Sequence, residues 1–105
     1  HWMNFSVGSS ACHIAVSQIQ KRDELIVELY INEDKELFHS LIQNKEDIES
    51  TTGFSLDWRE LPDKKASRIL ITHSAELANQ SKWNEQFDWL MNVMLKMKIG
   101  FKKYL

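Results

Sequence analysis

A cluster of carboxylates is the first place where this sequence could support chemistry. Glu46, Asp47 and Glu49 lie close together, and Glu46 and Glu49 are three residues apart on a predicted helix. Carboxylate oxygens at that spacing can share a divalent cation. No further ligand follows nearby in the sequence, and no histidine follows at helical spacing. We therefore predict a solvated helix face, on which Lys45 can pair with Glu49 one turn later.

The histidines and the single cysteine form no recognisable metal or catalytic motif. His13, His39 and His73 fall on a predicted strand, a helix and a strand end, at no spacing typical of metal ligands. Cys12 and His13 are neighbours on a strand, so their side chains point to opposite faces of the sheet. We predict that Cys12 is a small core residue, and we predict no catalytic residue, no metal ligand and no cofactor.

Two basic groups could contact phosphates. Lys64, Lys65 and Arg68 surround a turn between two predicted strands. The second group ends the final helix and consists of Lys96, Lys98, Lys102 and Lys103. Cations near a helix C-terminus are favoured by the helix dipole without any partner. The alternative is that Lys64, Lys65, Lys98 and Lys102 hold the phosphates of DNA.

One face of the predicted sheet is polar and mixes several residue types that bind ligands. Alternation places on it Asn4, His13, Ser17, Glu28, Tyr30, Arg59 and Arg68. Of these, the candidate binding residues are His13, Glu28, Tyr30, Arg59 and Arg68. Such a face can recognise a polar ligand or a partner domain, or it can simply be solvated.

The elements that carry these residues follow from hydrophobic periodicity. Alternating apolar residues predict strands at 3–7, 12–16 and 25–31, and the short turns between them indicate antiparallel pairing. A helix is predicted from an N-cap at Asn32 to a left-handed Gly53. Strands at 54–61 and 66–73 follow, and Ser81 is predicted to cap a final helix. Its apolar stripe consists of Trp83, Phe87, Leu90, Met91, Met94 and Phe101.

The predicted fold class is α+β. We expect an antiparallel or mixed sheet of about five strands, in the order β-β-β-α-β-β-α, with two helices packed on one face. Trp58, Trp83 and Trp89 sit at positions compatible with the core. Trp2 is the exception, because its alternation partners Asn4 and Ser6 are polar.

Composition limits the classes of protein. The 105 residues are enough for one domain, 1–105, and the net charge of −2 provides no basic excess to attract nucleic acid. A single cysteine fits a reducing cytoplasm, and no apolar run reaches the roughly 18 residues that a membrane helix needs. The sequence opens with His1 and Trp2 inside a predicted strand, so we expect a C-terminal fragment of a longer protein.

Several short motifs, in this order and spacing, resemble one protein family. They are Leu25 to Ile31, Lys45 to Glu49, Leu56 to Pro62, Lys65 to Ile69 and Trp83 to Leu90. Together they are similar to the bacterial and archaeal domain-of-unknown-function family four-two-six-eight. The resemblance implies a C-terminal module that often follows a restriction-endonuclease-like domain, in proteins with suspected defence or DNA-related roles. It supplies no functional residue, and Glu28 lacks the lysine two residues later that a metal-dependent nuclease strand needs.

Three hypotheses follow for the function. The first is a non-catalytic interaction module that presents its polar sheet face or terminal helix to an upstream domain, a second copy or another partner. The second is a DNA-binding accessory domain. The third is an enzyme that uses His13, Glu28 and Arg59, which would require a real pocket on the polar face.

Overall fold

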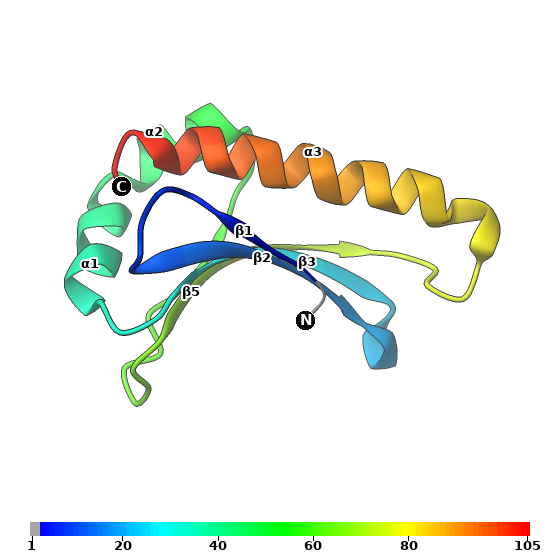
Figure 1. The fold of residues 1–105 in the computed structure, drawn as a ribbon, viewed down its shortest axis with the longest axis horizontal. Helices are drawn as coiled ribbons and strands as arrows, with labels where there is room; N and C mark the ends of the chain where they lie inside the picture. Colours follow the sequence, from blue (N-terminus) through cyan, green and yellow to red (C-terminus); the bar gives the residue numbers. More distant parts are fainter. Residues whose placement is uncertain (1–2) are drawn as a thin grey trace.

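The computed structural model describes residues 3–105, which form an antiparallel sheet with helices on one face (Figure 1). The strands are β1 (Met3–Ser6), β2 (Cys12–Ile19), β3 (Glu24–Ile31), β4 (Asp57–Arg59) and β5 (Ser67–Ser74). The helices are α1 (Lys35–Gln43), α2 (Lys45–Thr52) and α3 (Trp83–Lys102), with 3-10 turns η1 (Gln20–Arg22) and η2 (Gln80–Lys82). The predicted α+β class is confirmed.

The sheet order is β1-β2-β3-β5-β4, and every neighbouring pair is antiparallel. The last long strand, β5, therefore lies between β3 and the short strand β4. Val16, Val27 and Ile71 align across three strands, so their side chains share one face. This is the face that the helices cover (Figure 1).

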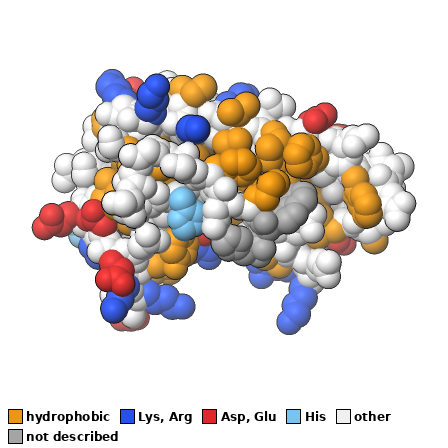
Figure 2. All heavy atoms as spheres, viewed as in Figure 1, with side chains coloured by type: hydrophobic (Ala, Val, Ile, Leu, Met, Phe, Trp, Pro, Cys, Tyr) orange, Lys and Arg blue, Asp and Glu red, His pale blue; other side chains and the backbone are white. Residues whose placement is uncertain are grey.

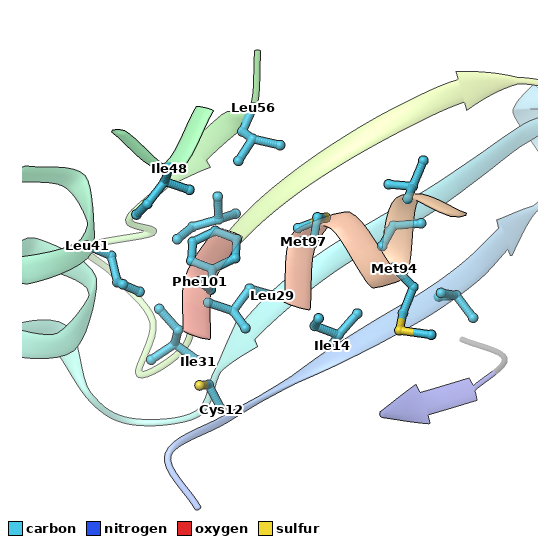
Figure 3. Packing of buried hydrophobic residues seen from close by; sticks show 14 of the residues in the cluster. Cys12, Ile14, Leu29, Ile31, Leu41, Ile48, Leu56, Met94, Met97 and Phe101 are labelled. Atoms are coloured by element: carbon cyan, nitrogen blue, oxygen red, sulfur yellow. The ribbon is translucent and has the colours of Figure 1, made fainter. Parts of the chain in front are cut away.

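The hydrophobic core lies between that face and α3 (Figure 3). Ile14 and Leu29 from the sheet and Met97 and Phe101 from α3 are fully buried there. Cys12 is 3 % exposed and belongs to the same cluster, as predicted. The 20-residue helix α3 thus provides most of the apolar cover for the central strands.

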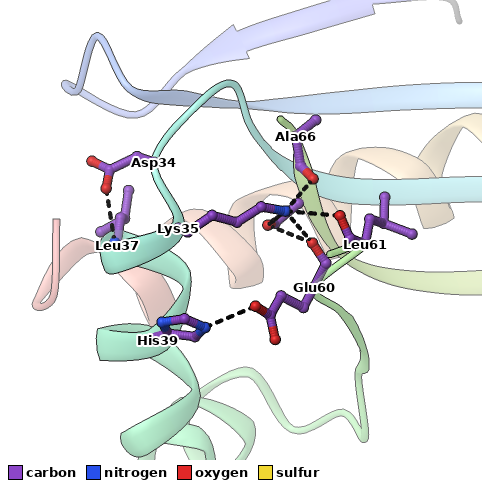
Figure 4. Close-up of polar contacts among 8 residues, drawn as sticks. Asp34, Lys35, Leu37, His39, Glu60, Leu61 and Ala66 are labelled. Atoms are coloured by element: carbon purple, nitrogen blue, oxygen red, sulfur yellow. Dashed lines mark hydrogen bonds and ion pairs between the residues drawn. The ribbon is translucent and has the colours of Figure 1, made fainter. Parts of the chain in front are cut away.

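The predicted helix from Asn32 to Gly53 is wrong in two respects. Its N-cap is Asp34, whose Oδ1 accepts a hydrogen bond from the Leu37 amide at 2.9 Å (Figure 4). The helix is also broken at Asn44, where φ is −108° and ψ is 21°. The Asn44 side chain donates back to a carbonyl of α1, which offers the backbone an alternative to continued helix. Gly53 ends α2 with φ of 81°, as predicted.

The final helix also begins differently from the prediction. Ser81 lies in η2, where its amide donates to Asn79 Oδ1 at 3.1 Å, and α3 starts at Trp83. Trp83 was predicted in the core, yet it is 52 % exposed. Its indole N–H donates to the Leu77 carbonyl at 2.9 Å, so the ring stays near the surface where that partner lies.

The other predicted core tryptophans are partly buried, and each contacts another ring. Trp58 lies 6.4 Å from Phe38 and 6.3 Å from Phe101, measured between ring centroids. Trp89 stacks on His73 at 4.4 Å. Trp2 lies outside the described residues. The predicted strand at 54–61 is reduced to β4, which pairs with β5 at only three positions.

The ammonium group of Lys35, at the start of α1, joins the helical layer to the loop between β4 and β5 (Figure 4). Its Nζ donates to the carbonyl oxygens of Glu60 at 2.5 Å, Leu61 at 3.0 Å and Ala66 at 2.8 Å. It also lies 3.0 Å from Ser67 Oγ, and Ser67 is fully buried. One side chain therefore fixes both ends of the loop.

We predict that Lys35→Met lowers the free energy of unfolding by about 2 kcal/mol. The substitution keeps the aliphatic stem but leaves several partly buried carbonyls without a charged donor. Urea unfolding followed by circular dichroism measures the change. Lys21→Met is the matched control, because Lys21 is exposed and its change is expected within about 0.5 kcal/mol. Equal stability of the two variants would contradict the role of the Lys35 ammonium.

Candidate functional site

The face of the sheet opposite the helices, here called the open face, carries the predicted binding residues. The register aligns His13 with Tyr30, Tyr30 with Arg68, and Arg68 with Arg59. These four side chains therefore form one row across β2, β3, β5 and β4. Glu28 lies in the adjacent row, opposite Ala15 and Leu70. The strand register thus brings all five predicted binding residues onto one surface.

An ion pair between Arg68 and Glu28 lies at the centre of the open face. Arg68 Nη2 is 2.5 Å from Glu28 Oε2, and Arg68 Nε is 3.1 Å from Glu28 Oε1. The Glu28 side chain is 8 % exposed and that of Arg68 is 29 % exposed. The bonded carboxylate raises the pKa of Arg68, so the guanidinium stays charged. Both carboxylate oxygens of Glu28 are therefore already occupied.

Two hollows adjoin at this ion pair, because Arg68 lines both. The first has a volume of about 620 Å³ and is lined by His13, Ser17, Tyr30 and Lys64 among others. The second has a volume of about 540 Å³ and lies toward β4, beside Arg59. Their volumes are in the range of small-ligand sites. The open face is therefore concave rather than flat.

Two loops form the rims of this concave surface. Figure 1 shows the β4–β5 loop and the β2–β3 connection bending away from α3 at opposite ends of the sheet, and Figure 2 shows basic side chains on that side at both ends. The first loop follows β4 and contains Leu61, which adopts a left-handed φ of 55°, and Lys35 holds the loop in place. The second contains η1 and ends at Asp23, with φ of 48°.

Two of the three carboxylates predicted to form a solvated helix face, Asp47 and Glu49, also hold other elements in place. Glu49 Oε2 accepts from the Leu56 amide at 2.8 Å and from the Trp58 indole N–H at 3.1 Å. It thereby anchors β4, and the Leu56 hydrogen bond is the main reason that the pKa of Glu49 is lowered. Asp47 accepts from the Tyr104 hydroxyl, which lowers the pKa of Asp47. Glu46 and Asp47 are exposed, as predicted, and only Glu49 of the three carboxylates is partly buried.

The groups considered for catalysis are not arranged as a reactive centre. Glu28 is held at both oxygens, and Arg59 lines the second hollow whereas His13 lines the first. Cys12 lies on the opposite face of the sheet, where burial raises the pKa of its thiol and disfavours the thiolate. Residues 3–105 contain no cluster of three or more His, Cys, Asp or Glu that could hold a metal ion. The geometry suits hydrogen bonding and ionic recognition.

The predicted phosphate-binding lysines are not brought together. Lys64 lines the first hollow and Lys65 lies beside it, 3.9 Å from Glu33, so both belong to a rim of the open face. Lys98 and Lys102 lie on α3, which covers the other face of the sheet. The two pairs therefore cannot contact one continuous phosphate backbone without wrapping around the domain.

Several residues that line the hollows were not among the predicted binding residues. Ala15, Ile26 and Leu70 form an apolar floor that is no more than 5 % exposed, although they lie on the open face. Arg22 joins the second hollow from the η1 turn. Alternation in β3 does indicate one of these residues, because Ile26 falls between Glu24 and Glu28 on the same face of the strand.

Comparison with known proteins shows the family to which the chain belongs. A family model described as "Domain of unknown function (DUF4268)" matches residues 1–105. No curated protein and no solved structure matches the chain. No helix within residues 3–105 combines the length and apolar character needed to cross a bilayer.

We predict that Arg68→Met lowers the free energy of unfolding by about 2 kcal/mol, because it leaves the buried Glu28 carboxylate unpaired. The value is below that of a fully buried pair because Arg68 is partly exposed. The double variant Glu28→Met/Arg68→Met should recover most of this loss, since no charge remains to be paired. Urea unfolding of the four proteins in a double-mutant cycle measures the coupling. If the losses of unfolding free energy in the two single variants simply add in the double variant, the coupling between Glu28 and Arg68 is contradicted.

The lowered pKa of Glu49 predicts a pH-dependent contribution to stability. Folding favours the ionised carboxylate, so the contribution is complete above the ordinary glutamate pKa of 4.5 and is lost as pH falls through the lower folded value. The stability advantage of the wild type over Glu49→Gln should therefore shrink as pH falls from about 5 to about 3. Thermal unfolding across this range measures it, with Glu46→Gln as the exposed control. A constant difference would count against the anchoring role.

Proposed function

Because the chain belongs to the DUF4268 family of domains of unknown function, we propose a function from its open face: a non-catalytic interaction module that binds a segment of a protein partner. The observation that carries this proposal is the concave open face, where a polar row crosses four strands above an apolar floor. Such a surface offers both hydrogen bonds and apolar contact, which protein interfaces combine.

The charges of the open face favour a polypeptide over nucleic acid. Arg22 is 2.9 Å from Glu24, Arg59 is 2.7 Å from Asp57, and Arg68 is paired with Glu28. A protein cation favours binding to a phosphate backbone by displacing counterions condensed on the nucleic acid, and a cation already paired with a carboxylate does this less well. Each of these arginines would first have to leave a carboxylate of its own chain. A polypeptide carries donors and acceptors of both signs and can bind beside the existing pairs.

The first hollow has the groups to orient a polypeptide segment. The rings of His13 and Tyr30 lie 5.5 Å apart and form one wall. Asn4 and Ser17 supply neutral donors and acceptors, and Lys64 supplies a cation at the rim. Lys64 forms no ion pair with the described residues, so it is available to a carboxylate of the partner.

We further propose where this partner lies. The family resemblance favours a bacterial or archaeal protein in which this module follows a nuclease-like domain, so an upstream domain of the same protein is the first candidate. A cytoplasmic location fits the single cysteine, Cys12. In this arrangement any nuclease chemistry belongs to the other domain, and this module positions it.

A random-peptide phage library selected on the purified domain tests the proposal. Enriched peptides should bind with micromolar affinity, and His13→Ala/Tyr30→Ala should weaken them about tenfold by removing one wall of the hollow. The matched control is Asn92→Ala, an exposed position on α3, which should leave affinity unchanged.

Two results would overturn the proposal. One is that the enriched peptides bind His13→Ala/Tyr30→Ala as tightly as the wild type. The other is salt-sensitive binding of a fluorescent DNA duplex that Lys64→Glu/Lys65→Glu abolishes while no peptide is enriched. That second result would establish the DNA-binding accessory function instead.

A further inference from the structure

A second surface, separate from the open face, lies on the outer side of α3. Leu95 and Ile99 of this helix are 52 % and 63 % exposed, although both are large aliphatic residues. Residues 89–105 contain no aspartate or glutamate, and their lysines are Lys96, Lys98, Lys102 and Lys103. Figure 2 shows basic and hydrophobic side chains next to each other over this half of α3. We call the surface formed by the two aliphatic residues and the four lysines the outer ridge.

The helical geometry of α3 places the two aliphatic residues farthest from the core. The mean direction of the buried residues defines the side of α3 that faces the sheet, and these residues are Leu90, Val93, Met94, Met97, Gly100 and Phe101. At about 100° per residue, Leu95 and Ile99 lie within about 25° of the opposite direction. Lys98 and Lys102 lie on one side of them, and Lys96 and Lys103 lie on the other. The outer ridge therefore has an apolar crest between two rows of cations.

The cations of the outer ridge are available to a ligand. Lys98 and Lys102 form no ion pair with the described residues. Lys96 Nζ lies 5.4 Å from the centroid of the Phe54 ring, a contact that supplies no opposite charge. Lys103 Nζ lies 3.5 Å from the carboxylate of Asp47, and this pair is exposed. The outer ridge therefore has a positive local charge, although the whole chain has a net charge of −2.

The apolar crest distinguishes between the possible anionic partners of these lysines. A nucleic-acid backbone supplies phosphates but no apolar phase into which Leu95 and Ile99 can be transferred. A second copy of the ridge would bring the same lysines face to face, and like charges repel. The surface of an anionic membrane supplies phosphates at the level of the ammonium groups and hydrocarbon just below them. Both kinds of residue on the ridge therefore find a partner at a lipid surface.

We propose that the outer ridge docks this domain on the surface of an anionic membrane. Leu95 and Ile99 insert among the lipid headgroups, and the flanking lysines extend along them to contact the phosphates. The contact is peripheral, so it needs no membrane-spanning helix. The open face lies on the other side of the sheet from α3 (Figure 1), so it stays accessible to a partner while the ridge is docked. This inference is independent of the function proposed for the open face.

Cosedimentation of the chain with sucrose-loaded vesicles tests the proposal. Vesicles of equal parts phosphatidylglycerol and phosphatidylcholine should bind the chain more than about tenfold more tightly than vesicles of phosphatidylcholine alone, because each lysine near an anionic surface strengthens binding about fivefold. Lys98→Gln/Lys102→Gln should therefore weaken binding to the anionic vesicles about 25-fold at low salt. The matched control is Lys21→Gln/Lys65→Gln, which removes two exposed lysines from loops that bend away from α3 and should change binding less than about twofold.

A second set of variants tests the apolar crest separately from the charges. Leu95→Ser/Ile99→Ser keeps every lysine and should weaken binding to the anionic vesicles about tenfold, because two exposed aliphatic side chains no longer enter the lipid. The matched control is Leu95→Ile/Ile99→Leu, which exchanges the two aliphatic side chains and should bind like the wild type. Both positions are largely exposed, so these variants should fold normally.

Three results would overturn the proposal. One is equal binding of the wild type to anionic and neutral vesicles. Another is undiminished binding of Leu95→Ser/Ile99→Ser to the anionic vesicles. The third is binding of a fluorescent DNA duplex that Lys98→Gln/Lys102→Gln abolishes while no vesicle is bound, which would assign the outer ridge to nucleic acid. None of these results affects the peptide selection on the open face, so the two proposals can fail separately.

Discussion

The Lys35 ammonium is the contact on which the working surface of this domain depends. Among the described residues, it reaches from the start of α1 to both ends of the β4–β5 loop, through three carbonyls and the Ser67 hydroxyl. The loop has a left-handed residue at Leu61, and its residues 62–65 are exposed. Lys64, which stands at the rim of the first hollow, therefore owes its position to a charge on the opposite side of the sheet.

Most of the fold could be predicted from the sequence because alternating apolar and polar residues in a strand indicate which of its faces is buried. In β3, Leu25, Val27 and Leu29 point into one core, and the pattern assigns their face without knowledge of any neighbour. The break at Asn44 could not be predicted in the same way. Both halves of that segment have helical periodicity, and the break depends on one side-chain amide competing for a backbone carbonyl. Trp83 was misplaced because periodicity does not reveal whether the indole N–H has a partner inside the core.

The sequence predicted which face of the sheet carries the candidate site, but not how its side chains line up across the strands. Alternation placed His13, Tyr30, Arg59 and Arg68 on one side of the sheet, yet their alignment as a row depends on β5 lying between β3 and β4. That order is set by long-range pairing, which leaves no local signal. For the same reason, the sequence could suggest Glu28 as a free carboxylate, whereas the register places Arg68 within bonding distance and neutralises it.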